Sequence, residues 1–445
     1  MSYQLPDNSP LKSPDFLYGV ATASFQIEGA NTADGRCESI WDRFCATPGR
    51  VLNGDDGSVA CDHYHRLESD LDLIQSLGMD AYRFSIAWPR IEPAPGEWNE
   101  KGFDFYERLI DGLIERGIKP YLTLYHWDLP QYLEDHGGWL NRETAYRFAD
   151  YAAKVSERFG DKVVSYATFN EPWCSSFLSY RIGEHAPGYK GEDRMAYQVA
   201  HHLLLAHGLA LPTMRKNAPN AKHGIVLNFT PAYPETDSEA DKAAAKYADD
   251  DSGEWFLEPI LTGHYPLQVV EKHPQWMPTQ MPGDMDIISR PVDFIGINFY
   301  TRCVIGTDEQ GEAKSLPAGE PRTDIGWEIY PAALTKLLIG MKEKYHNLPP
   351  LLITENGAAD NTDIADGVVD DTMRTDYYQA HLNAVHNAVE QGVNVCGYFA
   401  WSLMDNFEWA FGYSMRFGIV HVDYQTQQRT IKKSGKAWQA FLAER

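Results

Sequence analysis

The sequence lacks the features that would place a protein in a membrane or on the secretory route. No run of 18 or more apolar residues occurs among its 445 residues, which excludes a membrane-spanning helix. The first residues, MSYQLPDNSPLKSPDF, contain neither the basic nor the apolar segment of a secretory signal. We therefore expect a cytoplasmic protein.

Residues arranged to hold a metal ion or a nucleotide are also scarce. The six cysteines include no CxxC pair and no zinc-ligand spacing, which is typical of reduced thiols in a large cytosolic chain. His63 and His65 are better explained as exposed residues at a helix start, and the histidines of HHLLLAHG (201–208) as a helix face, than as ligands. No glycine-rich phosphate loop follows the first apolar segment. We predict neither a metal nor a cofactor.

Basic residues are few compared with acidic residues, whereas aromatic residues are abundant. There are 39 Lys and Arg against 63 Asp and Glu, for a net charge of −24. Such a surface repels nucleic acid and anionic membranes, so we expect neither as a partner. Aromatic residues make up 13% of the chain, with 12 Trp and 25 Tyr, which favours a cleft lined with rings. Whether the chain is a monomer or a homo-oligomer stays open.

Short apolar segments alternate with helical patterns along the whole chain. This alternation is typical of βα units and a parallel sheet. The predicted strands are 16–21, 81–88, 119–127, 163–169, 223–229, 293–300, 351–357 and 393–403. The predicted helices are 62–77, 103–116, 142–159, 195–214, one from about 239, 331–345, 372–391 and 434–443. Eight of each, without a linker or repeat, predict an α/β protein: a single (β/α)8 TIM barrel over residues 1–445, with long βα loops that form the cleft.

Polar and aromatic residues occupy the carboxyl ends of these strands, where barrel enzymes build their active sites. Glu355 follows the apolar run LLIT and precedes the turn Asn356-Gly357; taken alone, it could be a solvated loop residue. Glu171 comes just after the fourth strand, so the two glutamates should face each other across the barrel mouth. The other residues at strand ends are Gln26, Arg83, His126, Trp127, Asn170, Asn298, Tyr300, Trp401, Glu408 and Trp409.

This set of side chains favours one kind of chemistry. Paired carboxyl groups surrounded by hydrogen-bonding groups and indole rings are typical of glycoside hydrolysis, because one carboxyl protonates the leaving oxygen while the other attacks or activates water. Indole faces stack on the C–H faces of a sugar ring. A non-catalytic sugar-binding protein on the same scaffold is the alternative from another class.

Several motifs carry a resemblance to a known family. TFNEPW (168–173) and ITENG (353–357) resemble the two catalytic motifs of the family 1 glycoside hydrolases of the β-glucosidase type. FLYGVATASFQIEG, YRFSIAWPRI, LTLYHWDLPQ, GINFY and FAWSLMDNFEWAFGYSMRFGIV extend the similarity from about residue 14 to 441. The resemblance implies a retaining mechanism with Glu171 as general acid/base and Glu355 as nucleophile. Retention requires carboxyl groups roughly 5–5.5 Å apart.

The resemblance also assigns supporting roles. Arg83 and Tyr300 would keep Glu355 ionised, with Asn298 beside them, although a purely structural ion pair remains the alternative for Arg83. The sugar would be held by Gln26, His126, Trp127, Asn170, Trp401, Glu408, Trp409 and Phe417. Trp327 and Trp173 would line the aglycone side, with core packing as the alternative for Trp173.

The implied substrates are β-glucosides without phosphate. Relatives specific for phosphorylated sugars carry Ser, Lys and Tyr where this chain has Glu408-Trp409 and Arg416-Phe417, and Glu408 would repel a 6-phosphate. We therefore expect hydrolysis of cellobiose, short cello-oligosaccharides and aryl glucosides. β-Galactosidase, β-fucosidase or transglycosylase activity on the same site is the alternative, because these sugar-binding residues do not separate epimers.

Overall fold

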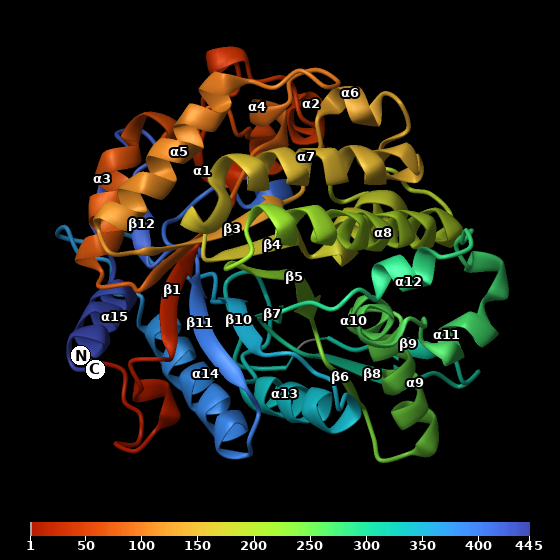
Figure 1. Ribbon diagram of the computed structural model, residues 1–445. Coiled ribbons are helices and arrows are strands. Elements are labelled where there is room, and N and C mark those ends of the chain that lie inside the picture. Colours follow the sequence, from red (N-terminus) through yellow and green to blue (C-terminus); the bar gives the residue numbers. More distant parts are fainter. Residues whose placement is uncertain (1, 318) are drawn as a thin grey trace.

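The barrel predicted from the sequence is the centre of the structure. The computed structural model describes residues 2–317 and 319–445, and within them eight parallel strands close in the order β1-β11-β10-β7-β5-β4-β3-β2 (Figure 1). The ring closes because β1 pairs with both β11 and β2. The strands are β1 (Leu17–Ala21), β2 (Ala81–Ser85), β3 (Lys119–Tyr125), β4 (Ser165–Asn170), β5 (Lys222–Phe229), β7 (Phe294–Phe299), β10 (Leu351–Asn356) and β11 (Val395–Trp401). The (β/α)8 prediction is confirmed.

The barrel strands are buried on both faces, as their near-continuous apolar runs predict. Every residue of β2, β4, β7 and β10 is buried. The interior is so closely filled that a Cβ added at Gly296 would lie 2.6 Å from Val226 Cγ2 and 2.8 Å from Thr354 Cγ2. Because the interior is packed, reacting groups belong at the strand ends.

Helices surround the barrel and cover its outer face (Figure 1). In α5, for example, Phe103, Tyr106, Leu109 and Leu113 are buried, which is the spacing of one helix face. The long helices are α3 (His63–Ser76), α5 (Glu100–Glu115), α7 (Glu143–Phe159), α8 (Asp193–Asn217), α9 (Glu239–Asp250), α10 (Gly253–Thr262), α13 (Ala332–Lys344), α14 (Thr372–Glu390) and α15 (Lys433–Ala443). The short ones are α1 (Ser24–Ile27), α2 (Ile40–Ala46), α4 (Trp88–Ile91), α6 (Gln131–Glu134), α11 (Leu267–Lys272) and α12 (Asp284–Ile288).

The connections contain more structure than the predicted alternation of eight strands and eight helices. Small strands β6 (Ala232–Pro234), β8 (Cys303–Thr307) and β9 (Ala313–Ser315) form a separate sheet, and β12 (Val420–Val422) pairs with β13 (Arg429–Ile431). A π-helix, Cys174–Ile182, follows β4. These segments lie beyond the barrel strands, in the connections from which (β/α)8 enzymes build their sites.

One prediction about the histidines is wrong. His65 is exposed, but His63 is buried, and its Nδ1 lies 2.8 Å from Asp70 Oδ2. Asp70 is also paired with Arg429, 3.0 Å away, so tertiary contacts account for a polar group that the local sequence placed in solvent. His201, predicted to lie on a helix face, is buried with Nε2 2.9 Å from Asp284 Oδ2. Over the described residues, the helices include none with the length and apolar character needed to cross a membrane.

Candidate active site

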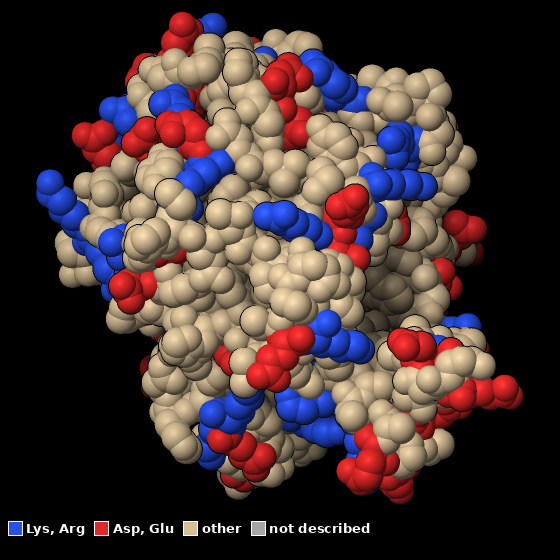
Figure 2. Space-filling model, turned by 90° about the vertical axis from the view of Figure 1, so that its right-hand side faces the viewer, with Lys and Arg blue, Asp and Glu red and all other residues tan. Residues whose placement is uncertain are grey.

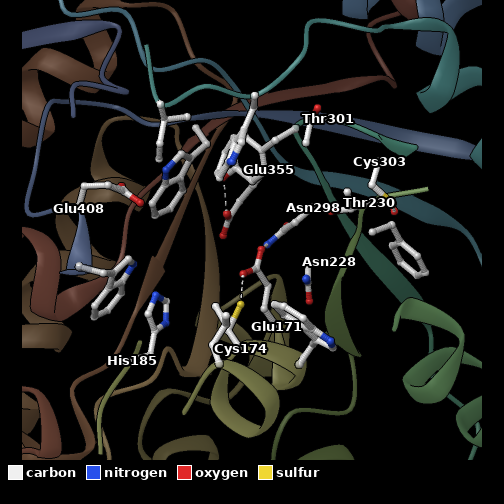
Figure 3. Close-up of a pocket in the computed structure, with 18 of the residues that line it drawn as sticks. Glu171, Cys174, His185, Asn228, Thr230, Asn298, Thr301, Cys303, Glu355 and Glu408 are labelled. Atoms are coloured by element: carbon white, nitrogen blue, oxygen red, sulfur yellow. Dashed lines mark hydrogen bonds between the residues drawn. The ribbon is translucent and has the colours of Figure 1, made fainter. Parts of the chain in front are cut away.

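A cavity of about 410 Å³ opens at the carboxyl ends of the barrel strands. Most of the site residues predicted from the sequence line it: Glu171, Glu355, Asn298, Tyr300, His126, Trp127, Trp173, Trp327, Trp401, Glu408, Trp409 and Phe417. The remaining three, Gln26, Arg83 and Asn170, are buried behind this lining. Residues far apart in the chain are thus brought to one place, and Figure 3 shows Glu171 and Glu355 pointing into the same space.

Glu355 lies at the carboxyl end of β10, only 3% exposed, and both its oxygens have partners. Arg83 Nη1 donates to Oε1 at 2.7 Å, and the Tyr300 hydroxyl donates to Oε2 at 2.7 Å. Burial raises the pKa of Tyr300 well above its ordinary value, helped by the charge of Glu355, so this phenol keeps its proton and stays a donor. Glu355 is therefore not a solvated loop residue.

Glu171 follows β4 directly and is buried as well. Its Oε1 accepts a hydrogen bond from Asn298 Nδ2 at 2.7 Å, and its Oε2 lies 3.2 Å from Cys174 Sγ. Burial, and then the charge of Glu355, raise the pKa of Glu171 to about 8. A carboxyl group in these surroundings carries a proton at neutral pH.

The two carboxyl groups differ because their partners differ. Burial also raises the pKa of Glu355, but the Arg83 guanidinium, then the Tyr300 hydroxyl and the Asn298 amide, oppose that rise. Within the described part of the chain, no cation is hydrogen-bonded to Glu171; its donors are an amide and a thiol. When the pair holds one proton, it therefore resides on Glu171 and leaves Glu355 ionised.

An amide network sets the orientation of these groups. Arg83 Nη2 donates to Asn170 Oδ1 at 2.6 Å, and the same oxygen accepts from Asn298 Nδ2 at 3.0 Å. Asn170 Nδ2 consequently faces His126 Nε2, 3.1 Å away. Burial and the charge of Arg83 lower the pKa of His126 well below its ordinary value, so the ring is neutral. Because Nε2 accepts, Nδ1 carries the hydrogen.

The buried polar atoms of this region that have no hydrogen-bond partner within the described part of the chain include Gln26 Oε1, His126 Nδ1 and Glu408 Oε2. Buried polar atoms are rarely left unpaired unless a ligand or water completes them. Rings pack beside them: His126 is nearly parallel to Trp401 and Trp409, with centroids 5.9 Å away in each case. This end of the cavity therefore combines flat apolar faces with open hydrogen-bonding positions.

The repulsion of a sugar phosphate, expected from the sequence, depends on the protonation state of Glu408. Burial, and then the charges of Glu355 and Glu171, raise the pKa of Glu408 to about 8, so at neutral pH the carboxyl is mainly protonated. Among the described lining residues, the one Lys or Arg is Arg302, and Glu328 pairs with it at 3.0 Å. A phosphate would therefore meet no unpaired lysine or arginine among the described lining residues.

The outer end of the cavity contains Trp327 and the half-buried Trp173. Trp327 packs against Tyr300, with centroids 5.3 Å apart, and Trp173 stacks on Phe177 at 6.2 Å. Sequence reasoning missed most of the remaining wall, formed by Glu184, His185, Asn228, Phe229, Thr230, Thr301, Arg302, Cys303, Val304, Leu316, Ile325, Glu328 and Phe411. Asn228 could have been predicted as a lining residue, because it lies near the carboxyl end of the fifth barrel strand.

Strained backbone also gathers at this site. Trp127, Glu171 and Trp409 have φ angles of 78°, 48° and 47°, in the left-handed region that residues other than glycine rarely adopt. Such conformations persist where the surrounding structure imposes them, and they cluster at active sites. Among the described residues there is no group of three His, Cys, Asp or Glu side chains suited to a metal ion.

Comparison with known proteins agrees with this geometry. Residues 10–445 match the family described as Glycosyl hydrolase family 1. The chain is 50% identical over 437 residues to a "Beta-glucosidase" of Agrobacterium sp., covering 96% of this chain and 94% of that one. A "Bifunctional beta-D-glucosidase/beta-D-fucosidase" of Bifidobacterium breve is 45% identical, with coverage of 96% and 97%.

Solved structures extend the similarity to three dimensions. The complex of the virulence factor SghA, from Agrobacterium tumefaciens, with its substrate analog salicin superposes with a TM-score of 0.94. The identity is 50%, and 96% of each chain is covered. A family match across nearly the whole chain, together with identities of this size, identifies it: the chain belongs to glycosyl hydrolase family 1.

Proposed function

We propose that this enzyme is a retaining β-glucosidase that removes terminal non-reducing β-D-glucosyl residues from cellobiose, short cello-oligosaccharides and aryl glucosides. The observation that carries the proposal is the unequal environment of Glu171 and Glu355 in one cavity. One carboxyl is held by a guanidinium and a phenol, the other by an amide and a thiol. The names of the relatives support the glucosidase activity.

In the first step, ionised Glu355 attacks the anomeric carbon while protonated Glu171 gives its proton to the leaving oxygen. Arg83 and Tyr300 hold the attacking carboxylate, and the raised pKa of Glu171 keeps the acid ready at neutral pH. The product of this step is a glycosyl ester of Glu355 and a released alcohol or sugar.

In the second step, the roles of Glu171 reverse. Esterification removes the negative charge of Glu355, which is one of the two causes that raise the pKa of Glu171. Glu171 therefore loses its proton more readily, accepts a proton from water, and the water oxygen attacks the anomeric carbon from the face that the alcohol left. Two inversions give retention, for which we expect the two carboxyl groups about 5–5.5 Å apart.

The inner end of the cavity is proposed to hold the non-reducing sugar. Gln26, Glu408 and His126 offer the open polar atoms for its hydroxyl groups, and Trp401, Trp409 and Trp127 offer ring faces. Asn170 would bind the 2-hydroxyl, a contact that strengthens in the transition state. Phe417 completes this set, and Trp327 with Trp173 would contact the aglycone.

The first-formed sugar anomer tests the mechanism. Proton NMR during rapid hydrolysis of an aryl β-glucoside should show the β-anomer appearing first, followed by mutarotation. Initial appearance of the α-anomer would mean inversion and would refute the proposed roles. No acceleration of hydrolysis over buffer would refute the enzymatic function itself.

A second activity is supported by one relative, which is named for both β-D-glucosidase and β-D-fucosidase activity. Fucose lacks the 6-hydroxyl of glucose and has the opposite configuration at C4. Both positions would lie at the inner end, where the carboxyl of Glu408, protonated at neutral pH because of its raised pKa, can donate or accept a hydrogen bond. Comparing kcat/KM for nitrophenyl β-glucoside, β-galactoside and β-fucoside decides which sugar is preferred.

The location and partners belong to the same proposal. All six cysteines are free, which suits a reducing compartment such as the cytoplasm. Figure 2 shows acidic and basic side chains interspersed on one face, a pattern unlike the continuous basic track that nucleic acid prefers. We expect a small β-glucoside as the partner, and fractionation of the source cells tests the location.

A further inference from the structure

Cys174 contacts the carboxyl group that the mechanism uses as acid and base. Its Sγ lies 3.2 Å from Glu171 Oε2, and Figure 3 shows the two side chains joined at the wall of the cavity. Cys174 begins the π-helix that follows β4, and its backbone N–H donates to the Glu171 carbonyl at 2.9 Å. The backbone thus holds the thiol one turn beyond the carboxyl, so this contact is built into the fold.

The two oxygens of Glu171 have different tasks. Arg83 has only donors, so the Asn170 atom facing it is an oxygen, and the Asn298 atom that shares this oxygen is a nitrogen. The other end of the Asn298 amide accepts from Thr354 Oγ1 at 2.7 Å. Asn298 Nδ2 can therefore only donate to Glu171 Oε1. The transferable proton of the acid belongs on Oε2, the oxygen that faces Cys174.

A thiol suits this position because it can act in both directions. It donates its S–H to an ionised carboxylate, and its sulfur accepts weakly when the carboxyl is protonated. Burial, and then the charge of Glu171, raise the pKa of Cys174 well above its ordinary value, so it keeps its proton. An ammonium or carboxylate in its place would favour one protonation state of Glu171 strongly over the other.

We propose that Cys174 is a positioning residue for the acid/base, and that its S–H stabilises the ionised form of Glu171 needed in the second step. This inference rests on the role proposed for Glu171. The thiol acts together with the other groups that face Glu171 or Cys174 from the surrounding elements: Glu355 of β10, Arg83 of β2, and Asn298, Tyr300, Glu408 and Glu184 from the other walls.

The test is the pH profile of two substitutions. Cys174→Ala removes the donor, so the pKa of Glu171 should rise by about half a unit, the scale of one weak hydrogen bond. The alkaline limb of kcat/KM for cellobiose then shifts to higher pH by that amount. Cys174→Ser keeps a hydroxyl donor and should hold the limb at or below the wild-type position.

A second substrate tests whether the substitution also changes the pKa of Glu171 in the second step. With dinitrophenyl β-glucoside the leaving group needs no acid, so kcat reports the second step, which requires ionised Glu171. The acidic limb of this kcat profile should therefore shift to higher pH in Cys174→Ala. In Cys174→Ser it should lie at or below the wild-type position. Cys45→Ala is the matched control, because this buried thiol lies on α2 and should leave both limbs in place.

The outcomes separate the two proposals. If Cys174→Ala and Cys174→Ser shift the limbs equally, or neither shifts them, the thiol only fills space and the inference fails. Full activity of Glu171→Gln toward cellobiose would instead refute the role of Glu171 itself. If Cys174→Ala does not fold, the pH profile of Cys174→Ser decides. An alkaline limb of Cys174→Ser at a pH well above the wild-type position would by itself overturn the inference about the thiol.

Discussion

Two buried clusters of charged side chains differ in how their charges are balanced. The active-site cluster contains three carboxyl groups, Glu171, Glu355 and Glu408, with Arg83 as the guanidinium bonded to one of them. The Asp405 cluster contains two carboxylates and three cations: Asp371, Asp405, Arg374, Arg416 and Lys432. In the active-site cluster the carboxyl groups outnumber the cations, whereas the Asp405 cluster has at least one cation for every carboxylate.

The pKa of Asp405 shifts in the opposite direction to the pKa values of Glu171 and Glu408. Burial alone would raise the pKa of Asp405, but Lys432, Arg416 and Arg374 outweigh it and hold the pKa below the ordinary value. Burial, and then the charge of Glu355, raise the pKa of both Glu171 and Glu408 to about 8, and among the described residues no cation is hydrogen-bonded to either carboxyl. Burial therefore favours protonated carboxyl groups where cations are too few, whereas three cations keep Asp405 ionised despite its burial.

The largest expected effect is on activity. Glu355→Gln keeps the size of the side chain but removes the attacking oxygen anion, so kcat for any aryl glucoside should fall by at least about 10⁴-fold. Circular dichroism should show an unchanged fold. Activity within tenfold of wild type would mean that Glu355 is not the nucleophile and that the excess of carboxyl groups in this cluster does not serve the proposed mechanism.

The same kind of substitution in the Asp405 cluster should affect stability instead. Lys432 is fully buried, with Nζ 2.6 Å from Asp405 Oδ1. Lys432→Met leaves that carboxylate short of a partner and should lower the free energy of unfolding by about 3–5 kcal/mol, measured by urea denaturation. The folded fraction should keep its kcat.

Lys433→Met is the control for this experiment. The neighbouring lysine is 30% exposed and pairs with Asp370 at the surface, so its loss should cost less than about 1 kcal/mol. Equal losses for both lysines would show that the Asp405 cluster contributes nothing beyond an ordinary surface pair.

A smaller effect links Glu408 to the pH dependence of stability. Its folded pKa is about 8 against an ordinary value of 4.5, so the folded protein binds more protons than the unfolded chain between these values. Stability therefore falls as the pH rises through this window. Glu408→Gln removes that loss, and between pH 5 and pH 8 its stability relative to wild type should increase by more than about 1.4 kcal/mol, one pKa unit.

Thermal or urea unfolding at several pH values measures this difference. Glu343→Gln is a suitable control, because this glutamate is exposed on α13 and its replacement should change stability by less than about 0.5 kcal/mol at each pH. A Glu408→Gln difference that stays constant between pH 5 and pH 8 would contradict the argument that burial keeps this carboxyl protonated.

The mildest prediction concerns the wild-type pH profile. The proposed mechanism requires a protonated Glu171 in the first step, so kcat/KM for cellobiose should decline above about pH 8, by tenfold for each further unit. The measurement needs only initial rates in overlapping buffers. A decline that begins near pH 5 would mean that Glu171 titrates like a solvent-exposed carboxyl.

Sequence and structure contributed different parts of this account. Alternating apolar segments predicted the barrel, and the positions of Glu171 and Glu355 at strand ends predicted that they share a cavity. His63 was predicted as exposed because local pattern cannot show that Asp70 and Arg429 enclose it. The outer wall with Thr230, Cys303 and Leu316 was missed because small strands in the connections give weak signals.

The sequence by itself determined which apolar segments form the barrel strands and that Glu171 and Glu355 lie at the carboxyl ends of two of them, because hydrophobic periodicity and turn residues act over short distances. Only the tertiary structure decided which carboxyl holds the proton. That outcome depends on Arg83 from β2, Asn298 from β7 and Cys174 from the π-helix, which meet Glu171 and Glu355 only when the barrel closes. Electrostatic interactions in a buried site depend on such distances, and these are set by packing rather than by spacing along the chain.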